Sequence, residues 1–342
     1  MTMKKLKSMN SNTLLLLITV ALFIVMYAGG CIVYGAKGFT HFQTFLNILI
    51  TNSGLICVAC GLTVVMLTAG IDISVGSLIA MDCMMLAVGM RNGIGAVQMC
   101  LLVLLTGIVF GCVQGFLIGY LEIQPFIVTM AGMFFGRGMT AVICTDQVSI
   151  TKDINEVFYN WANSKIIIPF GGYTNNKGKY MAPFVRVEVV IALIVLILIF
   201  LMLRYTRFGR ALYAIGGSET SAAMMGLNVK QTKMKAYILS SVLTSIGGIC
   251  YCLNTMAGSV QQATGLEMDA ISSAVIGGTL LTGGVGNVLG TFVGVLINGT
   301  ISSIVKTNGK LASSWPNILT AALLFVFIVI QSLFAAMRAR KK

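Results

Sequence analysis

Residues 54–90 read GLICVACGLTVVMLTAGIDISVGSLIAMDCMMLAVGM, and this stretch decides the fold class. Two apolar windows of about 20 residues, 45–67 and 72–90, meet at the break TAGIDISVGS (68–77). Charge is absent over most of both windows, and a bilayer selects this arrangement because a charged side chain is costly in hydrocarbon. The stretch therefore predicts two membrane helices that meet at an irregular, glycine-containing turn.

The rest of the chain has the same character. It has 342 residues, of which 57% are apolar and only 10% are charged, and its mean hydropathy is +0.93. A soluble domain needs far more charge on its surface. We therefore expect an all-α, polytopic membrane helix bundle with about ten transmembrane helices in a single domain over residues 1–342. The candidate windows are 13–34, 45–67, 72–90, 94–120, 125–144, 184–203, 236–255, 266–282, 285–305 and 315–336.

An even number of spans places both termini on one side of the membrane. Spans 2 to 5 and 7 to 10 would then enter from opposite faces, which is compatible with an inverted repeat. The first window is longer than the core of a typical cleaved signal peptide, so we expect it to be retained as a helix.

The net charge of +13 raises the question of nucleic acid binding. The basic residues, however, cluster beside apolar windows, at 4–7, 204–235 and 338–342. This is the positive-inside pattern. It predicts no nucleic acid partner, cytoplasmic N- and C-termini, a cytoplasmic segment at 204–235 and an external loop at 145–182. The flipped topology stays open, and the external loop is either a solvated connector or a docking surface.

Motifs for catalysis are absent from the sequence. It contains no G-x-x-x-x-G-K-[ST], so the chain has no P-loop with which to bind ATP. It has a single histidine, His41, and no Ser, His and Asp set, so we expect no catalytic residues. Cys57 and Cys60 have metal-like spacing, but no second pair accompanies them, so we expect no metal site.

Ionisable residues inside or beside spans are candidates for function because they are costly there. Asp72 lies at the break and could cap a helix that begins near Ile73. Glu267 and Asp269 lie at the start of span 8, where the helix dipole favours acidic side chains. A structural explanation is therefore sufficient for all three carboxylates. Two further candidates, Asp82 and Arg137, lie within spans.

Passage of a neutral solute requires amides and hydroxyls along the route. Each such side chain alone is more often an interhelical hydrogen-bonding group. The candidates are Asn47, Asn52, Ser53, Gln114, Gln124, Thr129, Ser240, Ser241, Asn254, Asn298 and Thr300.

The segment 204–235 is basic and contains a GG break. Within it, SETSAAMMGL predicts a short amphipathic helix that starts at Ser218 or Thr220 and ends at Gly226. Such a helix outside the bilayer suits the groove of a partner protein. The alternative is an ordinary basic loop held near anionic lipid.

Five stretches, in order, resemble the ribose, xylose and galactose class of ABC-transporter permeases. The resemblance extends from about residue 47 to residue 331, and it is closest in appearance to a galactofuranose-type sugar permease. The stretches are GIDISVGS (70–77), QPFIVTMAGMFFGRG (124–138), TRFGRALYAIGGSETSAAMMGL (206–227), EMDAISSAVIGGTLLTGGVGNVLGT (267–291) and SSWPNILTAALLFVFIVIQ (313–331). Small departures from the class pattern are Ser218, Met268, Ser272 and Ile73.

The resemblance implies a membrane-spanning subunit of an ATP-driven importer for a small sugar. Such a subunit sits in the cytoplasmic membrane, pairs with an identical or related permease and receives sugar from an extracytoplasmic binding protein. ATP and Mg²⁺ are bound by a cytoplasmic partner subunit, and this chain holds no cofactor.

Two sets of residues follow from this reading. The set expected to couple to the ATPase is Arg207, Phe208, Gly209, Arg210, Gly216, Gly217, Ala222, Ala223 and Gly226. The set expected at the pathway or gate is Asp72, Ser74, Gln114, Gln124, Thr129, Glu267, Asp269 and Asn298.

Three alternatives remain open on sequence. One is an ABC importer of a nucleoside or autoinducer. Another is an ion-coupled secondary transporter, in which Asp72, Asp82 and Glu267 would bind the coupling ion. The third is a membrane receptor that transports nothing, although such a protein would not need so many glycine-broken spans.

Overall fold

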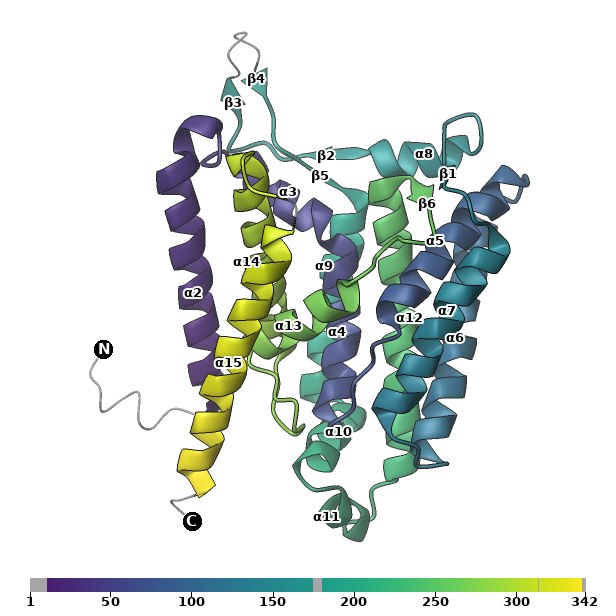
Figure 1. Cartoon of the computed structure of the whole chain (residues 1–342), viewed down its shortest axis with the longest axis vertical. Coiled ribbons are helices and arrows are strands. Elements are labelled where there is room, and N and C mark those ends of the chain that lie inside the picture. The colour runs from purple at the N-terminus through teal and green to yellow at the C-terminus, as the bar shows by residue number, and fades with distance from the viewer. Residues whose placement is uncertain (1–10, 175–179, 313, 340–342) are drawn as a thin grey trace.

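The computed structural model describes residues 11–174, 180–312 and 314–339 and shows a bundle of helices (Figure 1). The expected helical, polytopic fold class is confirmed. The strands form three short antiparallel pairs, all at one end of the bundle (Figure 1). These pairs are β1 (Val148–Ser149) with β6 (Ala257–Gly258), β2 (Lys165–Ile167) with β5 (Phe184–Arg186), and β3 (Tyr173–Thr174) with β4 (Tyr180–Met181).

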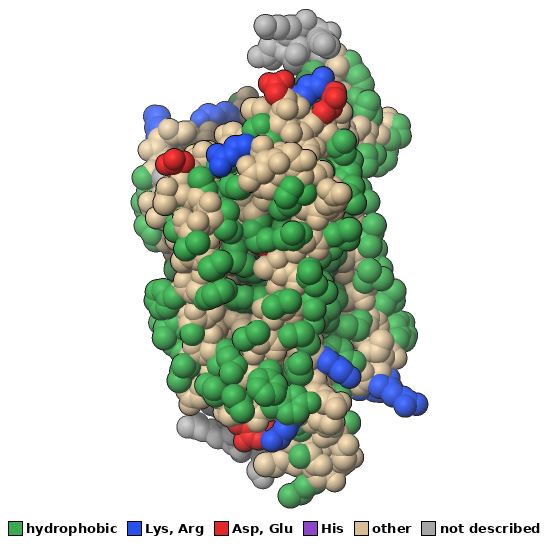
Figure 2. Space-filling model, turned by 90° about the vertical axis from the view of Figure 1, so that its right-hand side faces the viewer, with side chains coloured by type: hydrophobic (Ala, Val, Ile, Leu, Met, Phe, Trp, Pro, Cys, Tyr) green, Lys and Arg blue, Asp and Glu red, His purple; other side chains and the backbone are tan. Residues whose placement is uncertain are grey.

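Six helices in the described part of the chain are long and apolar enough to cross a membrane. The pair α3 (Phe42–Thr51) and α4 (Ser53–Leu67) bends by 57° at Asn52 and adds a seventh crossing if the two helices form one broken span. Figure 2 shows one flank of the bundle, on which hydrophobic side chains spread between two ends that hold most of the charge. The six helices are α2 (Ser11–Tyr34), α6 (Ala96–Gly119), α7 (Pro125–Ile143), α9 (Val187–Tyr205), α12 (Val229–Thr255) and α14 (Val288–Asn308).

The expected count of ten spans is not confirmed. The window 266–282 yields only α13 (Leu266–Ile276), whose 11 residues reach about 16 Å, roughly half of the hydrocarbon core. In the window 72–90 the chain stays irregular until α5 (Val75–Arg91) begins near mid-bundle (Figure 1). The last helix is α15 (Trp315–Ala339), and its stretch Trp315–Val329 is apolar but shorter than a full span. The inverted repeat stays a prediction.

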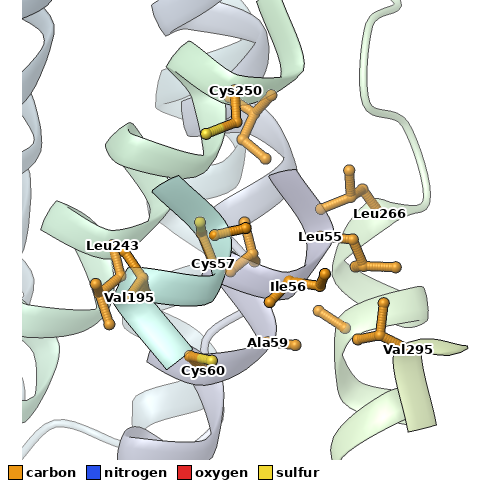
Figure 3. Packing of buried hydrophobic residues seen from close by; sticks show 14 of the residues in the cluster. Leu55, Ile56, Cys57, Ala59, Cys60, Val195, Leu243, Cys250, Leu266 and Val295 are labelled. Carbon is orange, nitrogen blue, oxygen red and sulfur yellow. The ribbon is translucent and has the colours of Figure 1, made fainter. Parts of the chain in front are cut away.

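Helix α4 lies at the centre of the bundle. All of its residues are buried, and α9, α12, α13 and α14 pack around it. Figure 3 shows its Cys57 and Cys60 among apolar side chains such as Val195 and Leu243. Both cysteines are free and buried, as small apolar residues are.

Helices α6 and α12 lie in backbone contact along most of their length. Glycine recurs every fourth residue on α6, at 107, 111, 115 and 119, and each faces α12. A Cβ atom at Gly115 would lie 2.7 Å from the carbonyl oxygen of Met234, and one at Gly119 would lie 2.6 Å from that of Lys230. Without side chains the two backbones can approach closely, which is how helices associate where lipid removes the hydrophobic drive.

The two ends of the bundle differ. At one end lie α10 (Arg207–Gly217) and α11 (Glu219–Met224), together with the start of α2 and the end of α15 (Figure 1). At the other end lie the strands, the short helix η1 (Gly35–Lys37) and α8 (Glu156–Asn163). The loop 145–182 contains α8, which buries Phe158 against the bundle. Because α12 begins at Val229, the connecting segment is shorter than the expected 204–235, and its last lysines lie on a helix.

A Gly115→Ala substitution should destabilise the protein by about 1–3 kcal/mol, because the backbone of α12 must move to admit the methyl group. The matched control is Gly29→Ala on α2, where a Cβ would meet nothing within 4 Å. That control should be neutral or stabilising, because alanine favours helix. Thermal unfolding of the two purified variants in detergent makes the comparison, and equal midpoints would contradict the close α6–α12 contact.

Candidate functional site

The break between α4 and α5 is held by a buried carboxylate. Asp72 is 1% exposed, and its Oδ1 accepts the backbone N–H of Ser74 at 3.0 Å and the Ser74 hydroxyl at 2.5 Å. Its Oδ2 accepts the hydroxyl of Ser240 on α12 at 3.3 Å. The helix begins at Val75 and not near Ile73, so Asp72 binds the residue before the helix and not the free N–H groups of its first turn. Asp72 therefore fixes the break against α12.

Other predicted pathway residues gather at the same break. Gln114 on α6 donates from Nε2 to the Ser74 hydroxyl oxygen at 3.0 Å. The hydroxyl of Thr129 on α7 lies 3.4 Å from the carbonyl oxygen of Ile71, while its shorter hydrogen bond, at 2.9 Å, goes to Pro125 in its own helix. Thus Asp72, Ser74, Gln114 and Thr129 lie together. Gln124 does not join them, because it is exposed at the start of α7.

The start of α13 forms a second break beside the first. The carboxylate of Glu267 lies so close to Gly76 that a Cβ there would overlap it, so the first turns of α13 and α5 meet. Arg137 on α7 donates to the carbonyl oxygens of Val260 at 3.0 Å and Gln262 at 2.6 Å. Arg137 thereby positions the segment that leads from α12 into α13.

Asn298 on α14 joins three helices. Its Nδ2 donates to the hydroxyls of Ser272 and Ser273 at 3.1 and 2.8 Å and to the carbonyl oxygen of Asp269 at 3.2 Å. Its Oδ1 accepts the hydroxyl of Thr320 on α15 at 3.4 Å. With its polar atoms bonded and 5% of its surface exposed, Asn298 has an interhelical role in this structure.

Helix α10 contacts the end of α4, where the first break begins, and the loop that follows α13, at one junction. Gly216 lies between the carbonyl of Leu67, which ends α4, and Gly284 in the loop 277–287 that joins α13 to α14, and a Cβ at Gly216 would overlap both. The N–H of Gly284 donates to the carbonyl oxygen of Leu67 at 3.0 Å. The hydroxyl of Tyr213 on α10 donates to the carbonyl oxygen of Gly286 at 2.9 Å. We call this contact the α10 junction.

The predicted coupling residues divide between the surface and the interior of the bundle. Five are exposed to solvent: Arg207, Arg210, Gly217, Ala223 and Gly226. Four face inward wholly or in part: Phe208, Gly209, Gly216 and Ala222. Only the first group is placed to touch another protein.

The predicted short helix is confirmed as α11. Its N-cap is Ser218, whose hydroxyl accepts the N–H of Ser221 at 3.3 Å. Gly226 has a φ of +80°, the left-handed conformation that glycine adopts after a helix, and the N–H of Leu227 returns to the carbonyl of Ala222 at 3.1 Å. Next to this end, Met224 is 88% exposed.

Two ion pairs attach the surrounding turns to α12. Lys233 contacts Glu219 of α11 at 2.6 Å, and Lys230 contacts Glu122 in the turn between α6 and α7 at 2.9 Å. The hydrogen bond from Lys230 and its charge lower the pKa of the Glu122 carboxyl, which therefore stays ionised at neutral pH. Both pairs are solvent-exposed, so they orient the turns more than they stabilise the fold.

Sequence reasoning missed the residues that α10 touches inside the bundle. Leu67, Tyr213 and Gly286 have no local signature, since an apolar helix end, a tyrosine and a loop glycine are common in any membrane bundle. The one usable signal was the pair of GG dipeptides at 216–217 and 283–284, which the structure brings together.

A hollow of about 720 Å³ lies between α5, α6 and α7. Its wall is almost wholly apolar, with Met81, Met99 and Phe135 among its members, and Gln114 is one of its few polar residues. A hydroxyl-rich solute would lose hydrogen bonds to water there without replacing them. Among the described residues, no group of three or more His, Cys, Asp or Glu side chains could hold a metal ion.

Comparison with known proteins identifies the family. The model of the permease component of branched-chain amino acid transport systems matches residues 44–330. The chain belongs to this family. It is 40% identical over 324 residues to the inner membrane ABC transporter permease protein YjfF of Escherichia coli K12, covering 94% of this chain and 93% of that protein.

Two further relatives carry substrate names. The chain is 33% identical to the fructose import permease protein FruG of Bifidobacterium longum, over 95% of this chain and 93% of that protein. It is 31% identical to the ribose import permease protein RbsC of Escherichia coli K12, over 86% of this chain and 87% of that protein. The resemblance to the ribose, xylose and galactose class is thus confirmed, and the chain is a multi-pass permease subunit of the ABC type. The ion-coupled secondary transporter and the receptor are the wrong alternatives.

Replacing Asp72 by alanine should destabilise the fold by about 1–3 kcal/mol for each buried donor left without an acceptor. Asp72→Asn keeps one acceptor for Ser74, while the Ser240 hydroxyl can turn to accept from the new amide. It should therefore unfold much closer to the wild type in a thermal melt. An equal drop in the unfolding temperature of the two variants would show that the hydrogen bonds to Asp72 do not hold the break.

Proposed function

We propose that this chain is the permease subunit of an importer that moves a small sugar into the cell with energy from a separate ATP-binding subunit. The relatives named for fructose and ribose support a sugar, although the family description names branched-chain amino acids. Within the sugars, the sequence stretches favour a galactofuranose-type substrate. A nucleoside or autoinducer is the alternative, and a thermal-shift ligand screen on the cognate external binding protein separates these substrates.

The orientation follows from charge. The sequence clusters at 4–7, 204–235 and 338–342 hold 3, 6 and 4 Lys and Arg residues, 13 in all, against nine in the connecting segments of the opposite side. Positive residues accumulate on the cytoplasmic side of membrane proteins. We therefore place the α10 end of the bundle, with both termini, in the cytoplasm. The end with α8 and the strands then faces outward, where an extracytoplasmic sugar-binding protein delivers its ligand.

The observation that carries the proposal is the α10 junction. An ATPase that binds the exposed face of α10 and α11 would press on a helix whose other face touches the end of α4 and the loop that follows α13. Movement of α10 would shift the start of α5 and the start of α13 together, because Glu267 lies against Gly76. Nucleotide can drive this change only if the ATPase contacts differ between its ATP-bound and ATP-free states.

Further partners follow from the same proposal. A second permease, identical or related, completes the route, and ATP and Mg²⁺ bind to the ATPase and not to this chain. The residues proposed to contact the ATPase are the exposed ones: Arg207, Arg210, Gly217, Ala223 and Gly226.

A Gly217→Trp substitution should abolish sugar uptake and the stimulation of ATP hydrolysis by the binding protein, because it fills the proposed contact face. A Cβ at Gly217 meets nothing within 4 Å, so the variant should insert and fold normally. The measurements are uptake and ATP hydrolysis by the complete transporter in proteoliposomes, with thermal unfolding of the permease as the check on folding.

The matched control for that experiment is Gly29→Trp on α2, at the flank of the bundle away from α10. It should keep both activities. Normal uptake by the Gly217→Trp transporter would refute the assignment of α10 and α11 as the ATPase contact.

A further inference from the structure

Two polar hollows lie in the half of the bundle away from α10. The outer hollow, about 340 Å³, is formed by α3 and the last turns of α14. The inner hollow, about 360 Å³, is formed by the start of α4, the end of α12 and the segment that leads into α13. Thr51 and Asn52 line both hollows, so the two adjoin at the bend between α3 and α4. Each volume falls near the lower end of the roughly 300–1,000 Å³ typical of small-molecule sites.

The bend at Asn52 shapes both hollows. The side-chain Nδ2 of Asn52 donates to the carbonyl oxygen of Ile48 at 2.8 Å, in competition with the helical backbone bonds, and this favours the 57° bend. Gly299 on α14 allows the close approach, because a Cβ there would lie 2.6 Å from that Nδ2. Among the described residues the Oδ1 of Asn52 has no hydrogen-bond partner.

The outer hollow has two facing polar surfaces. On α3, Asn47 and Thr51 are one turn apart, and on α14 Ser303 and Thr307 are likewise one turn apart. Neutral amides and hydroxyls both donate and accept hydrogen bonds, as the hydroxyls of a sugar do. The one ionisable side chain in this wall is Lys306, which is exposed.

The inner hollow combines polar groups with an aromatic ring. Its wall includes Gln261, Thr264 and the ring of Tyr251, together with the apolar side chains Leu55 and Leu266. A sugar ring presents C–H groups on its faces and hydroxyls at its edge, and a wall of this kind matches both.

The distribution of charge argues against an amino acid. The two charged ends of a zwitterion bind most strongly to side chains of opposite charge. Lys306 lines only the outer hollow and Asp269 lines only the inner one, so a small amino acid held in either hollow would find an opposite charge for just one of its two ends. The large groove between α5, α6 and α7 has the volume for a solute but an apolar wall, which suits lipid chains better.

We infer that the two adjoining hollows are a sugar-binding station within the permease, which takes a neutral pentose or hexose after the binding protein releases it. This inference rests on the proposed function. The outer hollow receives the sugar between α3 and α14, and the inner hollow passes it toward the start of α13. Asp269, predicted at the pathway from sequence, belongs to this station, and Asn52 and Ser303 are its central polar residues.

The first test measures protection of an introduced thiol. The full-length Ser303→Cys permease in lipid nanodiscs is treated with a membrane-impermeant maleimide, and labelling of the corresponding peptide is followed by mass spectrometry. D-ribose, D-fructose and D-galactose are added in turn, with L-leucine as the comparison. At least one sugar should slow labelling about threefold or more, the effect of filling two thirds of the sites, and leucine should not.

The control thiol is Thr40→Cys, which is exposed at the same end of the bundle but outside both hollows. Its labelling should be unchanged by any sugar. If no sugar protects the thiol at position 303, or if leucine protects it equally, the inference is overturned.

The second test separates the station from the coupling mechanism. Ser303→Trp fills the outer hollow and should reduce uptake about tenfold or more by blocking the passage, while ATP hydrolysis stimulated by the binding protein persists. Gly217→Trp should lose both activities. Ile32→Trp, on a lipid-exposed position of α2, should keep both.

These outcomes distinguish the two proposals. If the Gly217→Trp transporter is inactive but the Ser303→Trp transporter takes up sugar normally, the proposed sugar-binding station is wrong. The proposed function is then unaffected. If the Gly217→Trp transporter takes up sugar and hydrolyses ATP normally, the coupling proposal is wrong. The thiol-labelling measurement then tests the station independently.

Discussion

Backbone contact without intervening side chains is the constraint on which this structure depends. In hydrocarbon, helices gain little from hiding apolar side chains, so their association requires close van der Waals packing. The glycine row of α6 supplies that packing against α12, and Gly216 supplies it where α10 meets Leu67 and Gly284. The first contact fixes the scaffold. The second connects the α10 end of the bundle to the end of α4 and to the loop that follows α13.

Much of the fold could be predicted from hydropathy alone. Windows such as 94–120 and 125–144 became α6 and α7 within a few residues, because a spanning helix needs only length and apolar character. The windows 72–90 and 266–282 failed as uniform spans, since hydropathy does not tell a buried irregular segment from a helix. What keeps 70–74 irregular is a tertiary network around Asp72, and that network joins residues far apart in sequence.

The candidate site was predictable where its signals are local. Helix α11 has a cap residue and a terminating glycine within nine residues, so SETSAAMMGL revealed it. The walls of the polar hollows come from distant parts of the chain. Asn47 and Asn52 were recognised as candidates because amides in apolar windows are conspicuous. Ser303 and Thr307, in contrast, gain their meaning only from facing α3.

The two faces of α10 have separate tasks. Gly209, Gly216 and Tyr213 are committed to the interior, while Arg207, Arg210 and Gly217 point away from it. Residues on the outward face can therefore change without disturbing the packing of the bundle. Under the proposed coupling, substitutions on this face could adapt the protein to a different ATPase subunit while the membrane scaffold is retained. Specificity for the ATPase would then evolve independently of specificity for the solute.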